Sequence, residues 1–335
     1  MNKIWNELLE FETRDLVDRF IQKKYGREIN ANRVQQITSN FIQAREYFRS
    51  ADDSNFTVRP LLQYYGVMAL SKGLILSLNL SQTEHQLKSS HGLEVKNWKE
   101  VLKNKDFENL RICIGEGTFS ELITTTENKN YLSANSTAIN WASILKMPQI
   151  GEEFTLRQVI QYFPDLYKEY DSWLSDKLTF AVIQELKTQT DDGLTHVKLQ
   201  GLVNESDLEL LFPNEYCPDK LIVRENHSTL IKYSNPNWSP NITQRWHGAF
   251  NIGDGCVIPS LPNDIGLNLL SGMYIVSYVF GMMARYFPTS WIGIKRVEKG
   301  DKVYPFAHRI LEFIHEKYPK QVLDFLNSPY DFEAE

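Results

Sequence analysis

Apolar residues recur at helical spacing through the first part of the chain. In the segment 33–51 they follow one another at intervals of three or four residues, so they share one face of a helix. The shorter segments 4–11 and 16–25 repeat the pattern, and 98–110 has room for another short helix. These segments predict a bundle of amphipathic helices.

The most apolar helix is predicted at residues 59–76, RPLLQYYGVMALSKGLIL. Pro60 suits a first helical turn, because the N–H that proline lacks has no partner there. Apolar residues lie on all sides of this helix, which favours a central position. Lys72 is expected to extend past Ser71 and Gly73 toward water or a carboxylate, since a buried unpaired lysine is costly.

The pattern changes after residue 178. Four short β-favouring segments, LTFAVIQEL, THVKLQGLV, KLIVRE and STLIKYS, are separated by polar turns, which predicts a small antiparallel sheet. Helices return over about 264–286 and 305–326. Between the helical start and this sheet, residues 80–94 are typical of a loop, and RICIGEGTFSELI (111–123) of a β segment with a glycine turn.

The fold class that these patterns favour is mainly α. A helical bundle core is interrupted by a small antiparallel β insertion in the middle of the chain. The expected division is a helical region over 1–177, a β-rich insertion over 178–262, and C-terminal helices over 263–335 that pack back on the first region.

Composition narrows the class of protein. The 335 residues carry a net charge of -6, which argues against general nucleic-acid binding but leaves room for a local basic face. Cys113, Cys217 and Cys256 are odd in number and far apart, as expected of free thiols in a reducing compartment. Acidic residues near the start do not fit a signal peptide. We expect a cytoplasmic protein.

The uncharged run 265–284 is long enough to cross a bilayer. It contains Asn268 and several Ser, Gly and Tyr residues, and no basic cluster flanks it. A helix buried in the protein is favoured over a membrane span.

Several familiar chemistries lack their motifs. IGEGTFSEL (114–122) imitates the glycine-rich loop of protein kinases, but no His-Arg-Asp or Asp-Phe-Gly follows it. The chain has no Gly-x-Ser-x-Gly, Cys-x-x-Cys, His-Glu-x-x-His or Walker motif. No metal site or cofactor is expected.

A loose match to metal-dependent nucleases joins Asp165 to Glu185 and Lys187. In such enzymes, the two carboxylates hold a divalent cation and the lysine lies near the attacked phosphate. Glu185 and Lys187 would share a face of a strand, whereas Asp165 continues a helical pattern. A chance match is the stronger interpretation.

Arg309 and His315 form a second candidate site. On a helix, histidine can transfer a proton and arginine can stabilise phosphate charge. Six residues turn a regular helix by about 600°, so the two side chains would lie about 120° apart and share a site only through an irregularity or a dimer partner. An exposed helix with no catalytic role is the simpler reading.

Three blocks give the chain its resemblance to a known family: QAREYFRSADDSNFTVRPLLQYYGVMALSKGLIL, SSHGLE and GMMARYFPTSW. In this order they resemble the YaaC-like family of bacterial proteins, over about residues 40–95 and 270–292. The family implies a bacterial cytosolic protein and no particular reaction. The AREYF and Tyr-Tyr-Gly helices also look distantly similar to HEPN helical bundles, which implies an RNA-cleaving effector.

The leading hypothesis is therefore a defence or stress effector with HEPN-type ribonuclease activity, in which Arg309 and His315 act across a homodimer and RNA is a candidate partner. The alternative is a noncatalytic scaffold or binding subunit with a protein partner, and the third is the metal-dependent nuclease. Convergence of Arg59, Lys72, His91 and Arg285 would mark an anion or nucleic-acid site.

Overall fold

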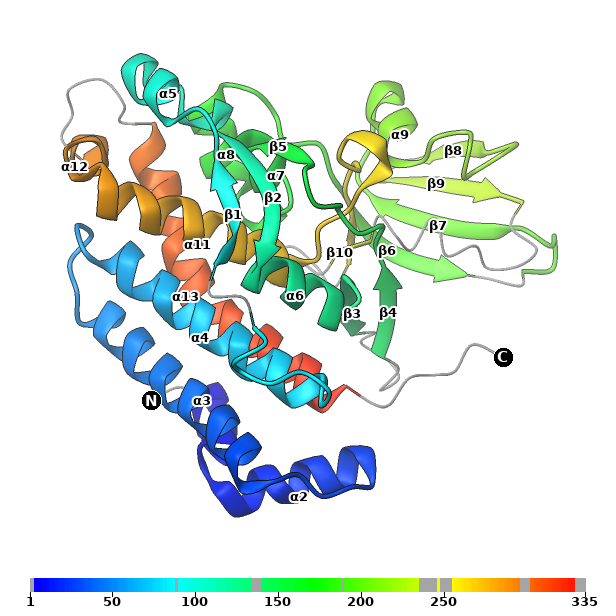
Figure 1. The fold of residues 1–335 in the computed structure, drawn as a ribbon. Coiled ribbons are helices and arrows are strands. Elements are labelled where there is room, and N and C mark those ends of the chain that lie inside the picture. Colours follow the sequence, from blue (N-terminus) through cyan, green and yellow to red (C-terminus); the bar gives the residue numbers. More distant parts are fainter. Residues whose placement is uncertain are drawn as a thin grey trace. The chain divides into compact units, whose positions relative to one another are not determined.

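The computed structural model describes residues 3–87, 90–133, 140–187, 190–234, 246–247, 255–295 and 302–328. It is mainly helical with small antiparallel sheets, which confirms the predicted class (Figure 1). The chain forms two compact units. The first comprises Met1–Thr126, Gln149–Arg157 and Leu270–Glu335, and the second comprises Glu127–Pro148 and Gln158–Leu269. The domain boundaries predicted from the sequence, at 177/178 and 262/263, are not tested by this division and stay a prediction.

Helices make up most of the first unit. They are α1 (Lys3–Leu8), α2 (Arg14–Tyr25), α3 (Ala31–Asp52), α4 (Arg59–Leu78), α5 (Trp98–Asn104), α6 (Thr118–Thr125), α11 (Leu269–Tyr286, all but its first residue), α12 (Pro288–Lys295) and α13 (Val303–Asn327), with the 3-10 turns η1 (Leu9–Glu12) and η2 (Phe107–Asn109).

Helix α4 packs between α3 and α13 (Figure 1). Glycine allows the close approach to α3: a Cβ on Gly66 would lie 2.6 Å from the ring of Phe48, and one on Gly73 would lie 2.8 Å from the ring of Phe41. Toward α13, the Gln63 amide donates to the carbonyl of Leu311 at 2.8 Å. A central place for the 59–76 helix, with Pro60 in its first turn, is therefore confirmed.

The two most apolar helices are buried within the structure. In α11, every residue from Leu269 to Met283 is buried, as the sequence predicts for 265–284. Helix α4 is long and apolar enough to span a membrane, and 67% of that stretch is buried inside the protein. A helix that is apolar on all sides is expected to be buried in the core, and both α4 and α11 meet this expectation.

A three-stranded antiparallel sheet, in the order β1-β2-β5, completes the first unit. Its strands are β1 (His91–Val95), β2 (Arg111–Gly117) and β5 (Glu153–Thr155). The loop predicted over 80–94 is wrong from His91 onward, because this segment pairs with β2, a partner that local pattern does not reveal.

The β segment predicted over 111–123 is also wrong beyond Gly117. There φ is +153° and β2 ends. The Gly117 N–H then donates to Ser120 Oγ at 3.0 Å, which caps the start of α6.

The second unit contains a six-stranded antiparallel sheet in the order β10-β11-β6-β7-β9-β8 and the hairpin β3-β4. The four predicted strands are present as β6 (Ala181–Lys187), β7 (Thr195–Gln200), β8 (Leu221–Glu225) and β9 (Ser228–Tyr233). The other strands of this unit are β3 (Lys129–Ser133), β4 (Asn140–Ile144), β10 (Trp246–His247) and β11 (Cys256–Val257). Its helical elements are η3 (Pro164–Leu166), α8 (Tyr167–Leu174), α9 (Glu205–Leu211) and η4 (Pro262–Asp264). Helix α7 (Leu156–Ile160) is divided between the two units.

Buried apolar side chains from β7, β9 and α9 form the core of this sheet. None of the three cysteines forms a disulfide with a described residue, as predicted.

Candidate functional site

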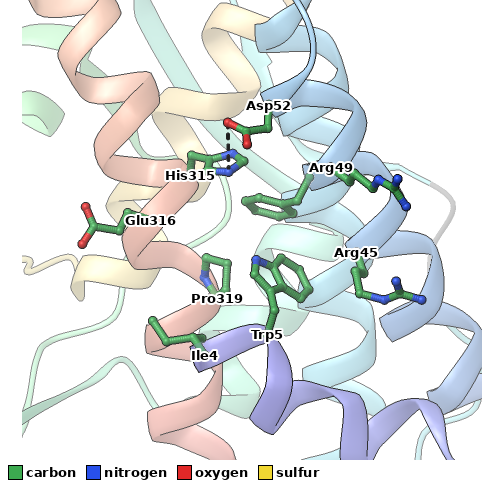
Figure 2. A pocket seen from close by; sticks show the side chains of 9 residues that line it. Ile4, Trp5, Arg45, Arg49, Asp52, His315, Glu316 and Pro319 are labelled. Atoms are coloured by element: carbon green, nitrogen blue, oxygen red, sulfur yellow. Dashed lines mark ion pairs between the residues drawn. The ribbon is translucent and has the colours of Figure 1, made fainter. Parts of the chain in front are cut away.

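A pocket of about 540 Å³ opens between α1, α3 and α13 in the first unit (Figure 2). One part of its wall is apolar and the rest is charged. It is lined by Ile4, Trp5, Arg45, Phe48, Arg49, Asp52, His315, Glu316 and Pro319. One of the two predicted catalytic residues, His315, is therefore part of a cavity.

His315 lies next to Asp52 in the wall of this pocket (Figure 2). Its Nε2 lies 3.7 Å from Oδ1 of Asp52, and its ring packs 5.4 Å from the ring of Phe48. Its Nδ1 is buried and has no hydrogen-bond partner among the described residues. One ring nitrogen is thus near a carboxylate, and the other is unused.

Burial lowers the pKa of His315 below its ordinary value. Arg59 also lowers this pKa, whereas Asp52 and Glu316 oppose the change. The result is an imidazole that is neutral near pH 7 and able to accept a proton. Arg59 Nε is another buried atom without a hydrogen-bond partner in the described chain.

Two arginines of α3 line the pocket, and their environments differ. Arg45 forms a two-pronged ion pair with Glu12, with N–O distances of 2.7 and 3.0 Å, and this pair raises its pKa. Arg49 is exposed, and no carboxylate pairs with it in the part of the chain that the structure describes. Both guanidinium groups point away from His315 in Figure 2. Arg49 is thus the cation that is available to a ligand.

Pro319 lies inside α13, one helical turn after His315, and lines the same pocket. A proline in a helix has no N–H for the carbonyl four residues earlier, which here is that of His315. The helical hydrogen-bond ladder is therefore interrupted at the pocket wall.

Arg309, the other predicted catalytic residue, is on α13 but not among the pocket-lining residues. Its side chain is 52% exposed and pairs with Glu312 at 2.9 Å. The structure therefore does not bring Arg309 and His315 of one chain together in this pocket.

The four predicted anion-site residues divide into two places. The charge of Arg59 lowers the pKa of His315. The pKa of His91 is lowered mainly by burial, and the charges of Arg285 and Lys72 lower it further. His91 also receives a hydrogen bond from a buried tyrosine, with 2.6 Å between Tyr64 Oη and His91 Nδ1. Lys72, His91 and Arg285 therefore form a group separate from the His315 pocket.

The residues of the nuclease hypothesis lie in the second unit. Asp165 is in η3, while Glu185 and Lys187 are on β6 and pair with each other at 2.9 Å. Within the described ranges, no group of three or more His, Cys, Asp or Glu side chains is arranged to hold a metal ion.

Comparison with known proteins places the chain in a family. The family described as YaaC-like Protein matches residues 9–326. The chain belongs to the YaaC-like family. The match includes all of the second unit and most of the first, with the His315 pocket from Arg45 onward and the group around His91. No curated protein and no solved structure matches this YaaC-like protein, so the HEPN-like core remains a prediction.

Sequence reasoning missed Asp52 and Arg49 of this YaaC-like protein. Both lie in the last turn of α3, at positions that the apolar spacing of this helix does not single out. Their role depends on the packing of α13, which no local pattern reports. The available signal was Pro319, a helix-breaking residue inside an otherwise regular apolar pattern beside His315.

Proposed function

We propose that this protein is a cytoplasmic bacterial effector of stress or phage defence that binds RNA in the His315 pocket and cleaves it without a metal ion. The observation that carries the proposal is the placement of a neutral imidazole next to the carboxylate of Asp52, in a cavity with both cationic and apolar walls. Metal-independent RNA cleavage needs a positioned base and a cation for the phosphate.

The reaction is an attack of the RNA 2′-hydroxyl on the adjacent phosphorus. His315 accepts the hydroxyl proton, the 2′-oxygen to phosphorus bond forms, and the bond to the 5′-oxygen of the next nucleotide breaks. That oxygen takes a proton from water, and the hydroxide left behind takes the proton from the His315 imidazolium. The products carry a 2′,3′-cyclic phosphate and a 5′-hydroxyl.

The neighbours of His315 have supporting roles. Asp52 stabilises the imidazolium that forms, because an opposite charge within about 4–6 Å favours the charged form. Arg49 reaches the phosphate by changing rotamer, which an exposed arginine does readily, and Arg59 adds positive charge on the buried side. The apolar residues Ile4, Trp5 and Phe48 offer a surface to a nucleobase.

In a homodimer, Arg309 has a further role. It is exposed on its own chain, so a second copy that docks against α13 would supply the phosphate contact to His315 of the first. In this arrangement the predicted pair would act together across the interface between the two copies.

The test uses a short RNA, in EDTA, and the same RNA with one 2′-deoxy nucleotide at the cleaved position. Cleavage of the first to a cyclic phosphate end, and protection of the second, support the proposal. Cleavage that needs a divalent cation favours the nuclease hypothesis. Binding without cleavage favours the noncatalytic binding subunit, and absence of both contradicts the proposal.

A further inference from the structure

His91 lies at the start of β1, among aromatic rings from α4 and α11. The ring centroid of His91 is 5.4 Å from that of Tyr64 and 5.5 Å from that of Tyr278. Tyr274 Oη donates to the backbone carbonyl of His91 at 3.1 Å. Side-chain and backbone contacts therefore both fix the position of the imidazole.

The hydrogen bond with Tyr64 decides which nitrogen of His91 carries the proton. Tyr64 is fully buried, and burial raises the pKa of its phenol far above the ordinary value, so it remains a donor. His91 Nδ1 must then accept, since the pKa of His91 is lowered and its ring is neutral. The proton is on Nε2, which makes no hydrogen bond to any described residue.

Two cations lie near this donor. Lys72 is seven residues after Tyr65 on α4 and therefore shares its face of the helix. Arg285 Nη1 donates to Tyr65 Oη at 2.7 Å. Neither Lys72 nor Arg285 is paired with a carboxylate in the described ranges.

One carboxylate and several phenols lie in the same region as these two cations. Glu94 on β1 pairs with Lys96 at 2.6 Å, and it acts on Tyr278, whose pKa rises to about 12, mainly through burial. Tyr274 and Tyr64 are neutral phenols, since burial raises the pKa of each. The group around His91 is therefore a fixed neutral donor beside two cations that form no ion pair with a described carboxylate.

We propose that His91 Nε2, Lys72 and Arg285 bind a phosphate-type oxyanion, either free or as the phosphoryl group of a small molecule. The Nε2–H of His91, held in place by Tyr64, would orient the bound anion. Charge-assisted hydrogen bonds from Lys72 and Arg285 would provide most of the binding free energy. The site is separate from the His315 pocket, and the proposal does not depend on RNA cleavage.

The experiment is a calorimetric titration of the full chain with inorganic phosphate and, separately, with AMP. Lys72→Met and Arg285→Gln should each weaken binding at least about tenfold, as expected for loss of a charge-assisted bond. Lys99→Met and Arg111→Gln are matched controls, because both residues are exposed in the same unit. These controls should bind like the unchanged protein.

Tighter binding of AMP than of phosphate identifies a phosphorylated small molecule as the source, and equal binding identifies the free anion. Either result supports the site. A nitrogen-detected NMR titration adds an independent readout: the pKa of His91 should rise when phosphate is bound, because the anion stabilises the imidazolium. No binding of either probe, equal loss in the controls, or an unchanged His91 pKa at saturation overturns the proposal.

Discussion

His315 Nε2 and Asp52 Oδ1 lie 3.7 Å apart, on helices from opposite ends of the sequence. Asp52 raises the pKa of His315 against the effect of burial. Asp52→Asn should therefore lower this pKa further, as an NMR titration of the imidazole would show. Glu316→Gln is the matched control, because Glu316 is a smaller cause of the same sign. An unchanged or increased pKa in Asp52→Asn contradicts this assignment.

Stability should fall as the solution is acidified through the range just below pH 6.5. Burial lowers the pKa of both His91 and His315 in the folded protein. The unfolded chain keeps values of about 6.5 and so binds more protons in this window, which favours unfolding as pH drops; above it the effect vanishes.

Urea unfolding at several pH values measures this slope. The double variant His91→Gln/His315→Gln should show a shallower dependence than the unchanged protein. His308→Gln is the control, since that side chain is 42% exposed. A slope that survives in the double variant would show that other groups cause the acid sensitivity.

The contact of α11 with α4 predicts a glycine effect. A Cβ on Gly281 would lie 2.7 Å from Cβ of Tyr64 and 3.3 Å from the carbonyl oxygen of Pro60, atoms with little freedom to move. Gly281→Ala should reduce the free energy of unfolding by about 1–3 kcal/mol. Gly293→Ala, in α12 with no atom within 4 Å, should be neutral or stabilising by up to about 1 kcal/mol. Equal effects in both would refute the close packing.

Arg33 stabilises the end of α4. It donates to the carbonyls of Gln82, Leu76 and Asn79, the last two at 2.5 and 2.6 Å. Desolvation lowers its pKa to about 10. Arg33→Met should cost about 2–4 kcal/mol in thermal or urea unfolding, because charge-assisted bonds are lost and carbonyls are left unpaired. Arg111→Met, at an exposed position, should cost far less; similar losses would show that Arg33 has no special role.

The helical core could be predicted because its signals are local. Pro60 marks the start of α4, and apolar spacing outlines α3. The strands β6 to β9 were equally clear, since turn residues separate them. His91 was read as part of a loop because its strand exists only through pairing with β2. Periodicity reports the neighbours along a helix or turn and not the partner of a short strand.

The candidate site was only half visible in the sequence. The sequence proposed His315 as a proton-transfer residue together with Arg309, but in the structure Arg309 pairs with Glu312, and the carboxylate near His315 is that of Asp52. Of the four predicted anion-site residues, Lys72 and Arg285 affect the pKa of His91, whereas Arg59 affects that of His315, so a shared anion site stays a prediction. Which of these side chains become neighbours depends on how α3, α4 and α13 pack, and this tertiary packing leaves no local signal in the sequence.

The rate of RNA cleavage by His315→Gln, measured in EDTA on one defined substrate, tests the central claim most directly. Loss of a general base predicts a rate at least about a hundredfold below that of the unchanged protein. The control variant Lys99→Gln, at an exposed position on α5, should keep the full rate, and the melting temperature of His315→Gln should confirm that it folds. Cleavage by folded His315→Gln at the unchanged rate would contradict the account.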